Sequence, residues 1–113
     1  MCIRDSSKLF RGSLDTIILK LLSEHSKMYG YEITQKVKEQ SNETFKITEG
    51  ALYPALHKLE AKGWLESETI SIGNRNRKYY SLTESGKGAL VSSVKEMQDF
   101  IAGLQLFIEP KLA

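Results

Sequence analysis

Apolar and polar positions follow the period of a helix in the first third of the chain. Five apolar residues fall at positions i, i+3, i+4, i+7 and i+8, on one face of a helix: Leu14, Ile17, Ile18, Leu21 and Leu22. Ser13 precedes this stripe and is suited to an N-cap, so we expect the helix to open there. After "HSKMYG", the segment "YEITQKVKEQ" carries Ile33 and Val37 four residues apart. This spacing predicts a second helix.

A third helix is predicted after residue 48. Thr48 is a suitable N-cap, and Gly63 has the residue type that commonly ends a helix. The apolar stripe between them consists of Leu52, Ala55, Leu56 and Leu59. Pro54 lacks an N–H group and is tolerated only in the first turn. We therefore expect the regular helix to begin near Gly50 or Ala51.

Two strand-like segments follow the third helix. "WLESETISI" and "RKYYSL" flank "GNRN", whose glycine and asparagines are able to adopt the positive φ angles of a tight turn. This pattern predicts a two-stranded hairpin with a strongly basic tip. The short segment "FKI", at residues 45–47, is a further candidate strand.

The last part of the chain has a heptad pattern. Thr83 is a suitable N-cap for a helix that runs until Pro110, and its apolar residues are separated by alternating steps of four and three. Such a seam either folds back on its own domain or pairs with a second copy, and its length favours a homodimer. The predicted interface consists of Leu90, Val94, Met97, Phe100, Ile101, Leu104, Phe107 and Ile108.

Composition narrows the class of protein. The chain has 113 residues, 41% of them apolar and 27% charged, which suits one small globular domain. No apolar run reaches the roughly 18 residues of a membrane span, and the first residues do not resemble a secretory signal. The single cysteine, Cys2, is compatible with a reducing compartment. We expect a cytoplasmic protein.

Charge and pattern together divide the chain into three segments. The net charge is only +2, and the positive excess precedes Thr83. Residues 1–7, "MCIRDSS", fit none of the patterns and are expected to be a disordered leader or an artefact of sequence assembly. Residues 8–83 form the predicted compact domain, and residues 84–113 form the predicted dimerisation helix.

Three helices followed by a hairpin is the order of a winged helix-turn-helix. The segments "MYGYEI", "TEGALYPALHKLEAKGWLES" and "RKYYSLTESG" resemble the PadR family of bacterial transcription regulators, and "RGSLD" is similar to the usual opening of that family. A single C-terminal helix resembles its short-form members. The resemblance implies a mainly α fold with a small β-hairpin and a homodimeric repressor. It also implies that some members bind an effector near the dimer interface.

Several polar residues are candidates for DNA contacts. On the third helix, Tyr53, His57 and Lys58 lie opposite the leucines, where they would reach bases or phosphates. Gln35, Lys36 and Thr48 are suited to holding the phosphate backbone. A cationic hairpin tip is suited to phosphates or to a narrow minor groove. Its candidates are Arg75, Asn76, Arg77 and Lys78.

Each of these candidates has a plainer interpretation. The cations of the hairpin tip, as well as Lys36 and Lys58, are alternatively solvated surface charges. Tyr53 is also able to cover the edge of the core, and His57 to be an ordinary surface histidine. Trp64 is interpreted as a core residue, with stacking on a flat effector as the alternative. The remaining tyrosines of the helices and strands, Tyr29, Tyr31, Tyr79 and Tyr80, are interpreted as packing residues.

Catalytic motifs are not evident. The chain has two histidines and one cysteine, and it contains no glycine-rich phosphate loop and no spacing typical of metal ligands. We therefore expect no enzyme, no cofactor and no metal. The predicted function is a sequence-specific regulator that binds an inverted-repeat operator in double-stranded DNA, with or without a small effector. The alternative is a winged-helix module that binds other proteins.

Overall fold

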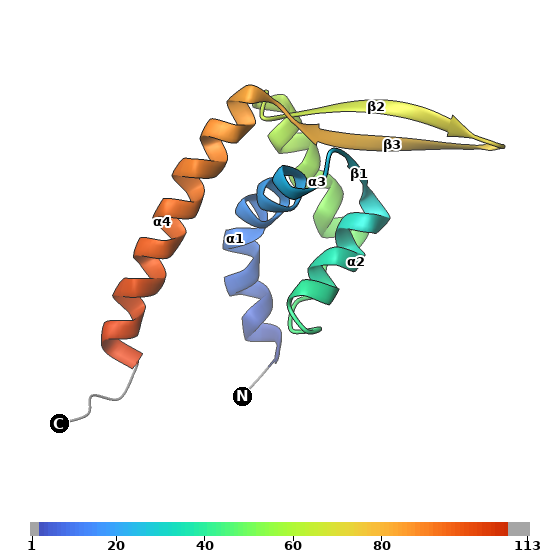
Figure 1. The fold of residues 1–113 in the computed structure, drawn as a ribbon. Helices are drawn as coiled ribbons and strands as arrows, with labels where there is room; N and C mark the ends of the chain where they lie inside the picture. The colour runs from blue at the N-terminus through green and yellow to red at the C-terminus, as the bar shows by residue number, and fades with distance from the viewer. Residues whose placement is uncertain (1–2, 109–113) are drawn as a thin grey trace.

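Within residues 3–108, the computed structural model describes four helices and one small antiparallel sheet. Side chains are described from Ser13 onwards. The elements are α1 (Ile3–Glu24), β1 (Met28–Tyr29), α2 (Gly30–Gln40), α3 (Glu49–Ala61), β2 (Leu65–Ile72), β3 (Arg75–Leu82) and α4 (Glu84–Ile108). In Figure 1, α1, α2 and α3 gather at the base of the hairpin, whose tip projects to one side while α4 leaves on the other.

The core lies between the three N-terminal helices and the base of the hairpin. Each helix contributes its predicted apolar stripe, which confirms the periodicity of the sequence. The fully buried side chains are Ile18, Leu19, Ile33, Leu52, Leu56, Leu59 and Tyr80. None of the helices in the described range is long and apolar enough to cross a membrane.

The hairpin forms as predicted. Ile72 pairs with Arg75, which leaves Gly73 and Asn74 as a two-residue loop. Gly73 has a φ of +60°, whereas Asn74 has no positive φ. A positive φ at the first loop residue alone is the pattern of a type II′ turn, which matches the twist of the two strands. The loop thus holds Arg75 at the very tip of the wing.

The third strand was not predicted, and the expected "FKI" strand was wrong. Met28 pairs with Tyr80 and Tyr29 pairs with Tyr79, so the sheet has the order β1-β3-β2. Residues 45–48 belong to no strand. The N–H of Phe45 donates to the Ser41 hydroxyl at 3.0 Å, so it does not pair with a neighbouring strand.

The start of α1 differs from the prediction. Ser13 lies inside the helix, which begins at Ile3, so its expected role as N-cap was wrong. Gly12 and Ser13 do not interrupt the helix, because both residues have the backbone N–H and C=O groups that form helical hydrogen bonds. Of the expected leader, residues 3–7 are helical and residues 1–2 lie outside the described range. The boundaries of the three segments stay predictions.

The N-cap of α3 was predicted correctly, but the place of its proline was not. The Thr48 hydroxyl accepts a hydrogen bond from the N–H of Ala51 at 3.2 Å. The helix begins at Glu49, so Pro54 is its sixth residue and lies beyond the first turn. Proline leaves the carbonyl of Gly50 without its usual donor. Both residues are exposed on the surface of the molecule.

Thr83 joins the end of α3 to the start of α4. Its hydroxyl donates to the carbonyl of Gly63 at 2.6 Å and accepts from the N–H of Gly86 at 3.0 Å, which confirms its predicted capping role. Its own N–H donates to the Trp64 carbonyl at 3.0 Å. Gly86 lies so close to that carbonyl that a Cβ atom would collide with it. The first turn of α4 is thus fixed to the segment that follows α3.

Candidate nucleic-acid interface

The predicted DNA-reading residues of α3 differ in their surroundings. Tyr53 is half-buried, and the hydroxyl end of its side chain lies against Gly30 at the start of α2. His57 is exposed to solvent. Lys58 is exposed too, but its Nζ lies 2.8 Å from Oδ2 of Asp15 on α1. Of the three side chains, His57 is therefore the most accessible, while Tyr53 also packs and Lys58 is paired.

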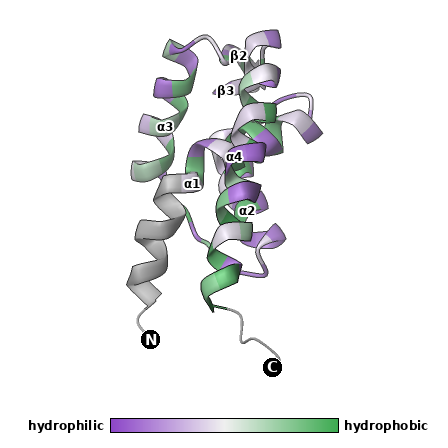
Figure 2. Cartoon of the chain, turned by 90° about the vertical axis from the view of Figure 1, so that its left-hand side faces the viewer, coloured by the Kyte–Doolittle hydropathy of each residue, from purple (hydrophilic) through white to green (hydrophobic). Residues whose placement is uncertain are grey.

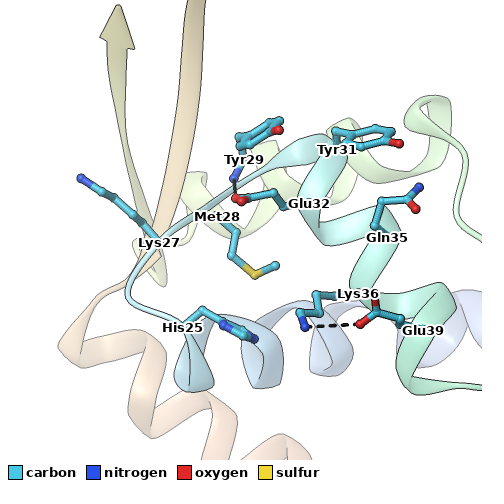
Figure 3. A pocket seen from close by; sticks show the side chains of 9 residues that line it. All are labelled: His25, Lys27, Met28, Tyr29, Tyr31, Glu32, Gln35, Lys36 and Glu39. Carbon is cyan, nitrogen blue, oxygen red and sulfur yellow. Dashed lines mark hydrogen bonds and ion pairs between the residues drawn. The ribbon is translucent and has the colours of Figure 1, made fainter. Parts of the chain in front are cut away.

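The two candidates on α2 lie along a hollow of about 330 Å³. Gln35 and Lys36 line it together with Tyr29 and Tyr31, as Figure 3 shows. Gln35 is exposed, and Nζ of Lys36 lies 3.4 Å from Oε1 of Glu39. Thr48 is outside this hollow, and its hydroxyl caps α3.

Alternation along β3 separates the cations of the wing onto two faces. Arg75 and Arg77 share a face, and the Cζ atom of Arg77 lies 4.4 Å from the centre of the Tyr29 ring. Lys78 lies on the other face, where its Nζ is 3.9 Å from Oε1 of Glu60 on α3. Within the described residues neither arginine forms an ion pair. The two arginines are thus more available to an anion than Lys78.

Asn76 lies beside Lys78 on the second face of the wing. Its side-chain Oδ1 accepts a hydrogen bond from the Ser71 hydroxyl at 2.7 Å. Ser71 and Asn76 are directly paired across the hairpin. Asn76 therefore fixes the two strands near the tip, and its amide NH₂ group is still a donor.

A second hollow, of about 530 Å³, joins the wing to α2. It is lined by Tyr29, Tyr31, Arg75, Asn76 and Arg77. It shares Tyr29 and Tyr31 with the hollow that contains Gln35 and Lys36. Arg75, Asn76 and Arg77 of the wing and Gln35 and Lys36 of α2 thus line two adjoining hollows, which together we call the wing–α2 surface. Lys78 is not part of it.

The two tyrosines of this surface were missed as site candidates. In Figure 3 the rings of Tyr29 and Tyr31 point to the same side, whereas Met28 points the opposite way. Met28 is buried, but Tyr31 is 55% exposed. The segment "MYGYE" changes from strand to helix, and side-chain directions repeat differently in the two structures. This change was the signal that Tyr29 and Tyr31 could face a different side from Met28.

The predicted interface residues of α4 fall into two groups. Leu90 packs against the core of its own domain, Val94 lines a hollow beside α1, and Met97 is half-buried. The later residues are exposed: Phe100, Ile101, Leu104, Phe107 and Ile108. Leu106 is exposed as well and was not predicted. The turns of α4 nearest the C-terminus are coloured hydrophobic in Figure 2.

An apolar hollow of about 370 Å³ is lined by residues of α1, by the end of α2 and the segment after it, and by Val94 of α4. The apolar side chains that line it are Ile17, Leu21, Val37, Phe45 and Val94. Its lining also includes polar residues, among them Lys20 and Gln40. A hollow of this composition is suited to an apolar small molecule.

Tyr80 is the group whose pKa departs clearly from its ordinary value within the described residues. Burial raises the pKa of its phenol, and the positive charge of Lys78 opposes this effect. The phenol is therefore neutral at physiological pH. Among the described residues, His, Cys, Asp and Glu side chains form no group of three or more that could hold a metal ion.

The match with a known family covers most of this architecture. The family model described as "Transcriptional regulator PadR-like family" matches residues 18–92, from α1 to the first turns of α4. The chain belongs to the PadR-like family. PadR-like proteins are transcriptional regulators, so this chain is a transcriptional regulator and not an enzyme.

Relatives extend the likeness beyond the matched segment. "Uncharacterized protein X" of Lysinibacillus sphaericus is 40% identical over 105 residues, which are 91% of this chain and 94% of that protein. The negative transcriptional regulator PadR of Bacillus subtilis is 35% identical over 74 residues, 65% of this chain and 40% of that protein.

A solved structure has the same fold over nearly the whole chain. The structure of a transcriptional regulator from Clostridium thermocellum, Cth-833, has a TM-score of 0.83 and 31% identity. The likeness covers 90% of this chain and 99% of that one. The predicted winged helix with a long C-terminal helix is thereby confirmed for this PadR-like protein.

Proposed function

We propose that this PadR-like regulator binds double-stranded DNA as a homodimer and represses transcription from an inverted-repeat operator. The observation that carries the proposal is the wing–α2 surface. Arg75 and Arg77 have no acidic partner among the described residues, and they share this surface with Gln35 and Lys36. Arginine and lysine side chains together with amides are the usual phosphate contacts of DNA-binding proteins.

The recognition helix in this proposal is α3. In a helix-turn-helix, the second helix of the motif enters the major groove. On α3 the exposed His57 is placed to reach a base edge, and the hydroxyl of Tyr53 lies beside the start of α2. Lys58 is available to a phosphate only when its ion pair with Asp15 opens.

The dimer in this proposal forms through α4. Its last turns expose large apolar side chains, with Phe107 88% and Phe100 62% exposed. A contiguous apolar surface of this kind is typical of a protein interface. Two-fold pairing of these helices would present two copies of α3 to half-sites about 34 Å apart, one turn of the duplex.

Repression and effector control are the finer parts of the proposal. Repression is supported by the Bacillus subtilis relative, which is named a negative transcriptional regulator. The expected effector is unidentified, and the apolar hollow beside Val94 is the site that we favour for it. A molecule bound there would contact both α4 and the ends of α1 and α2.

The test is selection of bound sequences from a random pool of duplexes with the full chain. An enriched inverted repeat, bound in the presence of competitor DNA, is the expected result. The double variant with Arg75→Ala and Arg77→Ala should enrich the inverted repeat poorly. A pool that yields no motif would overturn specific DNA binding and favour the protein-interaction alternative. A direct repeat or an asymmetric motif would contradict the two-fold dimer.

A further inference from the structure

The guanidinium of Arg77 lies over an aromatic ring from another strand. Tyr29 of β1 pairs directly with Tyr79 of β3, and Arg77 lies two residues before Tyr79 on the same face. The guanidinium therefore reaches diagonally across the sheet to the Tyr29 ring, at 4.4 Å. On its other side Tyr29 meets the edge of Tyr79, with ring centres 5.4 Å apart and planes at 70°. Tyr29 is thus held in place by Tyr79.

Stacking fixes the plane of a guanidinium but leaves its N–H groups free. When a guanidinium lies flat on a ring, the ring covers its face, whereas the five N–H donors point outward in its plane. A phosphate binds to these donors along the edge, often through two parallel hydrogen bonds. An arginine that is already held in one orientation loses less conformational entropy when it binds.

The hollow in front of Arg77 has the chemistry of a phosphodiester site. Arg75 and Arg77 supply positive charge, and Tyr31 supplies an exposed aromatic wall with a hydroxyl. Two acidic side chains close to this group are already engaged. Oε1 of Glu32 accepts from the N–H of Tyr29 at 3.1 Å, and Oε1 of Glu68 lies 3.2 Å from Nζ of Lys27.

We propose that Tyr29 is a positioning residue for DNA binding, because it orients Arg77 toward a backbone phosphate that also contacts Arg75 and Tyr31. This inference rests on the proposed function. It assigns a role to two tyrosines whose sequence context favours simple packing. It also predicts an asymmetry between the arginines, since Arg77 depends on Tyr29 whereas Arg75, at the tip, does not.

The test measures affinity for the selected operator across a salt series. Tyr29→Leu should weaken binding about two- to fivefold, the range expected for an exposed cation–π contact. It should also flatten the salt slope in the same direction as Arg77→Ala, by at most about 1.8 units for a dimer. Tyr29→Phe keeps the ring and should bind as the wild type does. In the Arg77→Ala background, Tyr29→Leu should have no further effect.

Two controls separate positioning from folding. Tyr79→Leu removes the ring that holds Tyr29, so it should reproduce part of the loss of affinity caused by Tyr29→Leu. Thermal unfolding of each variant identifies any loss of structure. If Tyr29→Leu does not fold, Tyr29→Met replaces it in the same cycle. Equal losses of affinity from Tyr29→Leu with and without Arg77 would overturn the inference, and so would unchanged binding.

Failure of this inference is distinguishable from failure of the proposed function. If the wild type binds no duplex, DNA binding itself is wrong. If the wild type binds and Arg75→Ala flattens the salt slope while Tyr29→Leu does not, only the positioning role of Tyr29 is wrong.

Discussion

The hydroxyl end of the Tyr53 side chain lies against Gly30. A Cβ atom built at Gly30 would come within 2.8 Å of Cζ of Tyr53, closer than real contacts allow. Because Gly30 opens α2 and Tyr53 belongs to α3, this contact brings the two helices of the DNA-binding motif together. Tyr53 therefore has a packing role, and any contact it makes with DNA comes in addition.

We expect Gly30→Ala to lower the free energy of unfolding by about 1–3 kcal/mol, the usual cost of overpacking a tight contact. Gly88→Ala is the matched control, because nothing lies within 4 Å of its Cβ position on α4. That change should stabilise the helix by up to about 1 kcal/mol. Chemical denaturation measures both. A Gly30→Ala variant as stable as the wild type would contradict the contact, and adding Tyr53→Leu should restore part of the loss.

The ion pair between Lys58 and Asp15 should limit DNA affinity. Asp15→Asn releases Lys58, so we expect tighter operator binding and a salt slope steeper by up to about 1.8 units for a dimer. The stability of the fold should change by less than about 1 kcal/mol, because the pair is exposed. Operator titration over a salt series measures the slope. If Asp15→Asn and the wild type have equal slopes, Lys58 does not reach a phosphate.

Arg75 should contribute to affinity but hardly to folding. Arg75→Ala removes one cation from the tip of each wing, so the salt slope should flatten by up to about 1.8 units in a dimer. Its unfolding temperature should stay that of the wild type, since exposed charges contribute little to stability. Lys95→Ala is the control on α4, where Lys95 pairs with Asp99. Equal slopes for Arg75→Ala, Lys95→Ala and the wild type would exclude Arg75 from the interface.

The apolar end of α4 should decide the oligomeric state. Ile101→Asp would bury an unpaired charge in the paired helices, at a cost of several kcal/mol, and should give a monomer that binds the operator poorly. Ser92→Asp adds the same charge at an exposed position one heptad before Asp99, and it should stay dimeric. Sedimentation of both variants compares them. A full dimer for Ile101→Asp would show that the seam is not the interface.

Tyr80 should make the fold sensitive to alkali. Its pKa is raised by burial, so the neutral phenol contributes stability that is complete below about pH 10, the unfolded value, and is lost as the pH rises through the folded value. Tyr80→Phe should therefore unfold at nearly the wild-type denaturant concentration at pH 7 but lose less stability above pH 10. If the stability of the wild type and that of Tyr80→Phe change with pH in the same way, this role of burial is contradicted.

Local patterns in the sequence were sufficient for most helices and for the hairpin. The stripes of α1, α2 and α3 are repeated within one or two turns, so neighbouring residues determine them. Strand β1 is only two residues long and exists because it pairs with β3, which lies about fifty residues later. The start of α1 was predicted too late because the prediction relied on the apolar stripe. The helix begins at Ile3, before that stripe does.

The residues of the candidate site could be predicted from the sequence, but the contacts between them could not. The cations of the wing could be recognised from "GNRNRK" alone. The partners of those cations could not, since Arg77 meets Tyr29 only through the register of the sheet and Lys58 meets Asp15 only through helix packing. Which cations are free for DNA is thus a property of the tertiary structure.

The contacts of Thr83 connect the end of α3 to the start of α4. The same hydroxyl binds the carbonyl of Gly63, which follows α3, and caps α4. In a dimer paired along α4, a small rotation of one paired helix against the other would swing both α3 helices in opposite directions. The distance between the two α3 helices would then depend on the crossing angle of the two α4 helices. Such a regulator would select operators by the spacing of their half-sites, and that spacing would be set by α4.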